Sequence, residues 1–146
     1  MNSEEAEALR LLAVEEGIER LRVAAVIVRA GRMLLVRRAA CDSLPGVFEL
    51  PSGSVEEGER LLTALRREVR EETSLRVLSV TCFLGAFDYR SSHGQSARQF
   101  TFRVEVGAGE PRLDPREHDH LTWVMPAELE RVGVSAQLRG VLRGLA

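Results

Sequence analysis

The chain has 146 residues, which is enough for one domain with a sizeable core. Hydrophobic residues make up 45% and charged residues 29% of it, as in an ordinary globular protein, and no apolar run approaches the length of a membrane span. The net charge of −2 does not favour a nucleic-acid or membrane-surface partner. The acidic N-terminus is unlike a secretory signal, and Cys41 and Cys82 lie far apart in the sequence. We therefore expect a cytoplasmic protein with two free thiols.

The first segment, residues 3–21, is predicted to be an amphipathic helix. Leu11 and Ile18 fall at helical spacing, and Asn2 or Ser3 can cap its first turn. We expect this helix to pack on the domain or to pair with a second subunit, which leaves a homodimer open.

The rest of the chain alternates between strand and helix patterns. Runs rich in β-branched or alternating apolar residues predict strands at 23–29, 33–37, 47–50, 77–89, 99–106 and 121–124. Gly31 can supply the positive φ of a tight hairpin between the first two strands. A loop is predicted at 52–58 and helices at 61–73, from Pro126 and from Ser135. Strands mixed with helices predict one α/β domain over residues 1–146, with residues 1–21 as a helical extension.

Three acidic residues share one face of the predicted central helix. Offsets of three and four residues place Glu68, Glu71 and Glu72 on one stripe, beside the apolar stripe of Leu62, Leu65 and Val69. Like charges at this spacing repel one another, so the stripe does not serve helix stability. Carboxylate oxygens are the ligands that Mg²⁺ and Mn²⁺ prefer, and the stripe therefore predicts a divalent-metal site.

The same region resembles the Nudix box, whose pattern is G-x5-E-x7-R-E-U-x-E-E-x-G-U with U a bulky aliphatic residue. Here Gly53 is followed after five residues by Glu59 and, after seven more, by REVREETSL from Arg67 to Leu75. Only Ser74 departs from the pattern, in place of a glycine that would form a left-handed helix cap. We expect serine to adopt that conformation at a cost of about 1 kcal/mol, without loss of activity.

The resemblance implies a Nudix-type α/β/α sandwich with a mixed central sheet, here carrying an additional N-terminal helix. It also implies a site. The metal ligands would be the backbone carbonyl of Gly53 and the carboxylates of Glu68, Glu71 and Glu72, and Arg67 would brace these carboxylates. Glu59 would either pair with Arg67 or hold an outer-shell position.

A further acid comes from a second run, EHDHLTW from Glu117 to Trp123, which is similar to a Glu-His-x-x-x-x-Trp arrangement of the same family. Glu117 is the candidate for an additional metal ligand or the general base. His118 and His120 are spaced for a metal site on a strand, but we favour the interpretation that both are surface histidines.

The expected activity is hydrolysis of a diphosphate linkage in a nucleotide-type small molecule, dependent on Mg²⁺ or Mn²⁺, with Glu71, Glu72 or Glu117 as general base. A nucleoside triphosphate or modified nucleotide is favoured. The alternatives are a nucleotide sugar of the ADP-ribose type and a catalytically silent nucleotide-binding module. Candidate substrate contacts are Arg37 for phosphate or base, Phe48 for stacking and Gln99 for a base edge, each weighed against an ordinary structural role.

Overall fold

The computed structural model describes residues 1–38 and 48–131. Within them, seven strands form a mixed sheet with the order β3-β2-β1-β6-β5, while β4 pairs with β1 and β7 pairs with β2. The β1–β6 pair is parallel and the other pairs are antiparallel. The elements are α1 (Ser3–Glu15), β1 (Arg20–Arg29), β2 (Arg32–Arg38), β3 (Phe48–Glu49), β4 (Ser52–Ser54), α2 (Leu61–Thr73), β5 (Val77–Arg90), β6 (Ser96–Val106), β7 (His118–Val124) and the 3₁₀ helix η1 (Pro126–Arg131).

The core has two parts because both faces of β1 are buried. Val23, Ala25 and Ile27 join the cluster beneath α2, whereas Ala24 and Val26 join a second cluster that includes Leu129 of η1. Alternate residues of a strand point to opposite faces, so β1 separates the two clusters. The predicted mixed sheet with helical layers and an N-terminal helix is confirmed. The helix predicted from Ser135 lies outside the described residues.

Helix α1 is shorter than predicted. The side chain of Asn2 accepts a hydrogen bond from the backbone N–H of Glu5, so the predicted cap is present, but the helix ends at Glu15 rather than at residue 21. Gly17 takes a positive φ of 78°, and the chain then enters β1 at Arg20. The N–H groups of Gly17 and Ile18 donate to the backbone oxygens of Val14 and Ala13, so the helix ends in a left-handed glycine cap before the strand begins.

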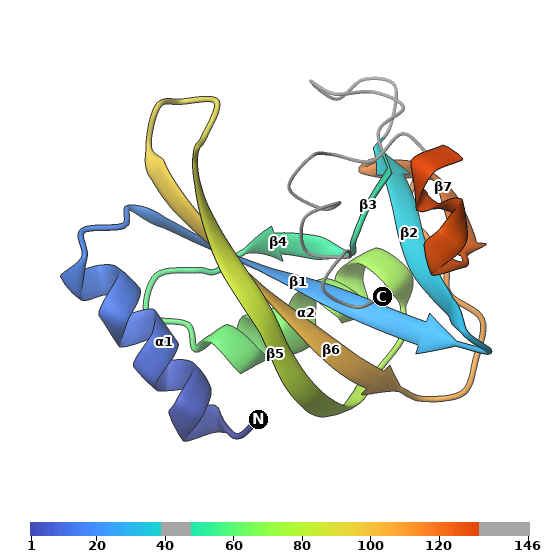
Figure 1. The fold of residues 1–146 in the computed structure, drawn as a ribbon, viewed down its shortest axis with the longest axis horizontal. Coiled ribbons are helices and arrows are strands. Elements are labelled where there is room, and N and C mark those ends of the chain that lie inside the picture. The colour runs from blue at the N-terminus through green and yellow to red at the C-terminus, as the bar shows by residue number, and fades with distance from the viewer. Residues whose placement is uncertain (39–47, 132–146) are drawn as a thin grey trace.

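Helix α1 packs on the domain, which is one of the two arrangements predicted for it; the other was pairing with a second subunit. Ala6 and Ala13 are buried in the cluster beneath α2. The N-terminal amino group donates to the backbone oxygen of Val80 at 3.1 Å, and Arg98 of β6 pairs with Glu16 at 2.6 Å. These contacts fix both ends of α1 against the sheet (Figure 1).

Two loops show what sequence could and could not anticipate. The hairpin between β1 and β2 turns through Ala30 (φ 51°) and Gly31 (φ 74°), and such positive values at both central residues match the right-handed twist of the strands. By contrast, the predicted loop at 52–58 is wrong at its start. Its first three residues form β4, which pairs with the β1 segment 22–24.

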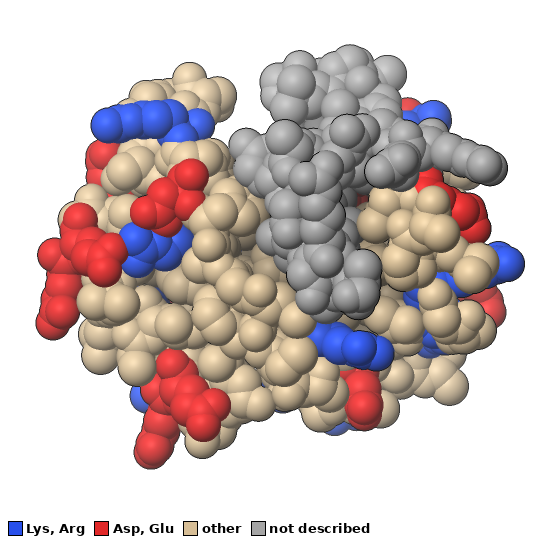
Figure 2. All heavy atoms as spheres, in the orientation of Figure 1, with Lys and Arg blue, Asp and Glu red and all other residues tan. Residues whose placement is uncertain are grey.

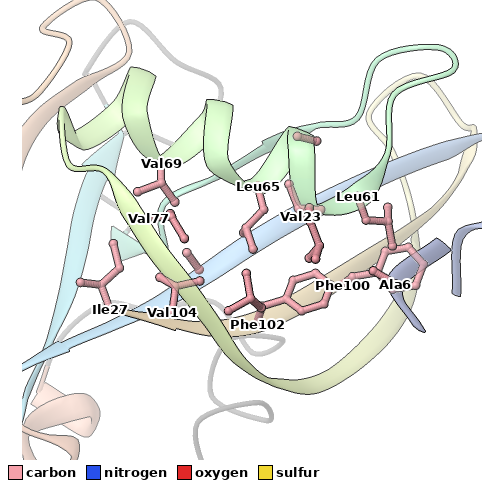
Figure 3. Packing of buried hydrophobic residues seen from close by; sticks show 14 of the residues in the cluster. Ala6, Val23, Ile27, Leu61, Leu65, Val69, Val77, Phe100, Phe102 and Val104 are labelled. Carbon is pink, nitrogen blue, oxygen red and sulfur yellow. The ribbon is translucent and has the colours of Figure 1, made fainter. Parts of the chain in front are cut away.

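Helix α2 lies across the sheet and carries the candidate site. Leu61, Leu65 and Val69 point from α2 toward Val23, Ile27, Phe100, Phe102 and Val104 on the strands (Figure 3). All of these side chains are nearly or fully buried. Burying each large aliphatic side chain contributes about 1.5–3 kcal/mol, so this packing fixes the rotation of α2 about its axis. The acidic stripe is thereby fixed as well.

Candidate active site

Both ends of α2 behave as the sequence indicates. No side chain caps its start at Arg60, and it ends at Ser74, which adopts a left-handed conformation with φ 62°. Serine at this position thus adopts the left-handed conformation that glycine has in the box pattern, as predicted. The helix presents Glu68, Glu71 and Glu72 in three different environments, with Glu71 exposed, Glu68 mostly covered and Glu72 buried.

Gly53 lies against the carboxylate of Glu68. A Cβ built at Gly53 would overlap the carboxylate carbon and both oxygens of Glu68, so a side chain at this position would displace that group. Burial raises the pKa of Glu68, and the guanidinium of Arg67 only partly offsets this effect. The backbone of β4 therefore approaches the Glu68 carboxylate closely at Gly53, as the absence of a side chain permits.

Glu72 is the most enclosed acid of the three. Its exposed fraction is 5%, and the backbone N–H of Ser52 donates to its Oε2 at 2.9 Å. Burial raises the pKa of Glu72 to about 9, and the negative charges of Glu68, Glu49 and Glu117 act in the same direction. Without a cation nearby, this carboxyl group holds its proton at neutral pH.

Arg67 connects the acidic residues to the loop before the helix. Its guanidinium donates to Glu59 (2.8 Å), Glu68 (2.7 Å) and the backbone oxygen of Ser54 (2.9 Å), with a longer contact to Glu71 (3.4 Å). The predicted pairing of Arg67 with Glu59 is confirmed, and that hydrogen bond holds the pKa of Glu59 below its usual value. A planar guanidinium with several donors can fix the orientation of more than one carboxylate at once.

Strand β7 and the turn before it bring two further groups to α2. Glu72, Glu117 and His118 each place one carboxylate oxygen or ring nitrogen within 4.8 Å of the other two. Glu117 is exposed, and its charge raises the pKa of both Glu68 and Glu72. The expectation of two surface histidines is wrong for His118, which is 3% exposed and lies 3.2 Å from Oε1 of Glu49 through its Nε2. His120 is exposed, as expected.

These groups fit a hard divalent cation. Glu68 lies against the backbone of Gly53, and the charges of Glu68 and Glu117 raise the pKa of Glu72, so a bound cation would relieve the repulsion that a proton on Glu72 otherwise relieves. The raised pKa of Glu72 is what such a site shows when no cation neutralises it. Glu71 is the fourth predicted carboxylate ligand. It lies one helical turn from Arg67, and its side chain is 57% exposed.

Two of the three candidate substrate contacts lie together. Arg37 of β2 is in register with Phe48 of β3 on one side and His120 of β7 on the other. The guanidinium of Arg37 lies 5.9 Å from the centre of the Phe48 ring, and the Phe48 and His120 rings meet edge to face at 6.0 Å. Arg37 also pairs with Asp119 at 2.8 Å. Gln99 lies elsewhere, on β6 across β1 from this group.

The sequence pattern did not indicate Glu49 or the Ser52 amide as parts of the site, and it favoured a surface position for His118. A register shift between Arg37 and Arg38 puts one extra β7 residue between His118 and His120. In an unbroken strand the two histidines would share a face, but the irregularity sends His118 inward and leaves His120 outside. The sequence shows both histidines in the EHDHLTW run. It does not show the irregularity in the β2–β7 pair, because that pairing joins distant segments of the chain.

Figure 2 shows one face of the molecule. Outside the grey atoms, basic and acidic side chains are interspersed among uncharged ones there, without a large patch of one charge. Among the described residues, no helix combines the length and apolarity needed to cross a bilayer.

Comparisons with known proteins support the family that the box pattern indicates. The model of the NUDIX domain matches residues 19–145. "Putative 8-oxo-dGTP diphosphatase 2" of Mycobacterium tuberculosis (strain ATCC 25618 / H37Rv) is 36% identical over 124 residues, covering 85% of this chain and 86% of that protein. "CTP pyrophosphohydrolase" of Escherichia coli (strain K12) is 34% identical over 111 residues, covering 73% and 76%. The crystal structure of a MutT NUDIX hydrolase from Burkholderia pseudomallei aligns with a TM-score of 0.77 at 28% identity, over 87% of this chain and 98% of that one.

The matched region begins just before β1, so it contains the sheet, α2 and every acidic residue of the site, and leaves α1 outside. With the box residues arranged around Gly53 and relatives named as diphosphatases over most of its length, the chain belongs to the Nudix family and is a Nudix-type pyrophosphohydrolase.

Proposed function

We propose that this protein hydrolyses a nucleoside triphosphate or a modified nucleoside triphosphate to the monophosphate and pyrophosphate, with Mg²⁺ or Mn²⁺ as cofactor. The observation that carries the proposal is the gathering of Glu68, Glu72 and Glu117 beside Gly53. In the reaction a water oxygen bonds to phosphorus, the bridging P–O bond breaks, and the water proton passes to a base. A divalent cation, when bound, neutralises phosphate charge and makes a nearby water more acidic.

The protein side of this chemistry is positioning and proton transfer. Gly53, Glu68, Glu71, Glu72 and Glu117 are the proposed cation ligands. Glu68 is held by Arg67 and Glu72 by the Ser52 amide, so both carboxylates are oriented before substrate arrives. Glu71 and Glu117 are exposed and can reach a water molecule. We assign the general base to one of these two, because an oriented ligand that already accepts a protein hydrogen bond is less free to take a proton.

The substrate class is supported by two observations. The relatives are named for action on 8-oxo-dGTP and CTP, both nucleoside triphosphates. Phe48 with Arg37 offers an aromatic face next to a positive charge, which suits a base and a phosphate respectively. Gln99 remains a predicted contact to a base edge. The cytoplasmic location and the homodimer also stay predictions.

The test is product analysis over a panel of substrates. Nucleoside triphosphates, oxidised nucleotides, a nucleotide sugar and a dinucleoside polyphosphate are each incubated with Mg²⁺, with Mn²⁺ and with EDTA. We expect pyrophosphate from a triphosphate, only with metal. If phosphate-containing products form only from the nucleotide sugar, the proposed substrate class is wrong. If the folded protein binds a nucleotide in the presence of metal but does not hydrolyse it, the result favours a catalytically silent nucleotide-binding module.

Glu71→Gln separates an enzyme from a binding module. An enzyme loses most of its turnover with this change, while circular dichroism remains unchanged because the side chain is exposed. A binding module would have no rate to lose.

A further inference from the structure

His118 is buried with one ring nitrogen unsatisfied. The residue is 3% exposed, its Nε2 lies 3.2 Å from Oε1 of Glu49, and its Nδ1 is buried without a hydrogen-bond partner in the described part of the chain. An unpaired buried polar group costs about 1–3 kcal/mol, so its presence calls for a physical reason.

The Glu49 contact decides which nitrogen is available. A carboxylate accepts a hydrogen bond, so the contact is satisfied when Nε2 carries the proton and donates it to Glu49. In that tautomer Nδ1 carries a lone pair directed away from Glu49. Histidines that bind metals commonly donate their other N–H to a carboxylate in this manner.

The neighbours of His118 are themselves cation ligands. One ligand atom from each of Glu72, Glu117 and His118 lies within 4.8 Å of the other two. With metal–ligand distances near about 2.1 Å, two ligands on opposite sides of an ion lie about 4.2 Å apart and neighbouring ligands about 3 Å apart. Three atoms within 4.8 Å of one another therefore close on an ion through movements of about 1–2 Å, and the exposed side chain of Glu117 is free to move.

We propose that His118 supplies a nitrogen ligand, through Nδ1, to a divalent ion that it shares with Glu72 and Glu117. The ion belongs to the same site as the proposed function, so the inference rests on that function and deepens it. An imidazole ligand favours transition metals, whereas Mg²⁺ prefers oxygen throughout its coordination sphere. The site therefore binds Mn²⁺ in preference to Mg²⁺, and His118 is the source of that preference.

The chain allows a clean spectroscopic test, because it has only three histidines, His93, His118 and His120. The double variant His93→Gln/His120→Gln, prepared without a histidine tag, keeps His118 as the sole imidazole. Mn²⁺ is added at less than one equivalent, and ¹⁴N modulation is measured by pulsed electron paramagnetic resonance. We expect a signal from directly bound nitrogen in the wild type and in the double variant. Absence of the signal from either protein, with Mn²⁺ bound, overturns the inference.

His118→Gln is the matched loss variant, since its amide can still donate to Glu49. We expect it to lose the nitrogen signal and to lower the ratio of the Mg²⁺ to the Mn²⁺ dissociation constant by roughly 10-fold, measured by calorimetry. An unchanged ratio in folded His118→Gln contradicts the inference. If this variant does not fold, the double variant still decides.

Hydrolysis is scored separately from coordination. Metal-dependent hydrolysis without nitrogen coordination leaves the proposed function intact and removes the inference. Nitrogen coordination without hydrolysis of any substrate supports the inference and contradicts the proposed function.

Discussion

Replacing Glu72 with glutamine should make the metal-free protein more stable while removing its activity. Glu72 is 5% exposed, and burial raises its pKa to about 9 from an ordinary value of 4.5. Between these values the folded protein holds a proton that the unfolded chain has released. The unfolded state thus binds fewer protons, and the free energy of unfolding falls as pH rises from about 4.5 toward 9.

The magnitude follows from the distance between the assay pH and the ordinary pKa. Each pH unit costs about 1.4 kcal/mol, so at about pH 7.5 the wild type loses up to about 4 kcal/mol relative to a neutral side chain. Water that enters beside the carboxylate reduces this figure, which makes it an upper bound. Glutamine cannot ionise, and its carbonyl oxygen can accept the Ser52 hydrogen bond that Glu72 accepts at 2.9 Å. Glu72→Gln avoids the whole penalty.

The assay is denaturant unfolding in EDTA at several pH values between about 5 and 8.5, with wild type, Glu72→Gln and Glu71→Gln. The difference in the free energy of unfolding between Glu72→Gln and wild type should widen with pH, reaching at most about 4 kcal/mol at about pH 7.5. Glu71→Gln is the matched control, because this side chain is 57% exposed and its replacement should change stability little. A gap that stays constant with pH, or a less stable Glu72→Gln at high pH, refutes the reasoning.

Four further changes test other parts of the site. Gly53→Ala should displace the Glu68 carboxylate and lower kcat about 100-fold, with unchanged circular dichroism; near-normal kcat would show that the close contact is dispensable. Arg67→Ala should lower the free energy of unfolding by roughly 2 kcal/mol in denaturant titrations, because its carboxylate partners lose their cation. Ser74→Gly should raise stability by about 1 kcal/mol at constant kcat, since its φ of 62° suits glycine, and a lower melting point would contradict this. Phe48→Ala should raise KM for a nucleoside triphosphate roughly 10-fold with little change in kcat, if a base stacks there.

The acidic stripe could be read from sequence because it depends on helix geometry alone. Once Leu65 and Val69 fix the inward face of α2, the positions of Glu68 and Glu72 follow. The Arg67–Glu59 pair spans only eight residues and was likewise within reach. The left-handed conformation of Ser74 could also be predicted, because this position ends the helix and has glycine in the box pattern.

What sequence missed depends on contacts between distant strands. The helix expected over residues 3–21 ends before Gly17, a glycine cap that local sequence could have signalled, but residues 20 and 21 form a strand because β1 pairs with β6, with Arg20 opposite Ala97. The inward turn of His118 depends on an irregularity in the β2–β7 ladder. Neither partner strand can be inferred from the local pattern, so neither the strand conformation of Arg20 and Leu21 nor the burial of His118 could have been predicted locally.

The most direct test of the account is the initial rate of pyrophosphate release from the best triphosphate substrate, titrated with Mg²⁺ and with Mn²⁺, for wild type and Glu72→Gln. The account predicts metal-dependent release by wild type and a loss of at least about 100-fold in Glu72→Gln, even though that variant is the more stable protein without metal. Release that persists in EDTA, or a Glu72→Gln rate equal to wild type, would contradict the assignment of the α2 carboxylates as the catalytic metal site.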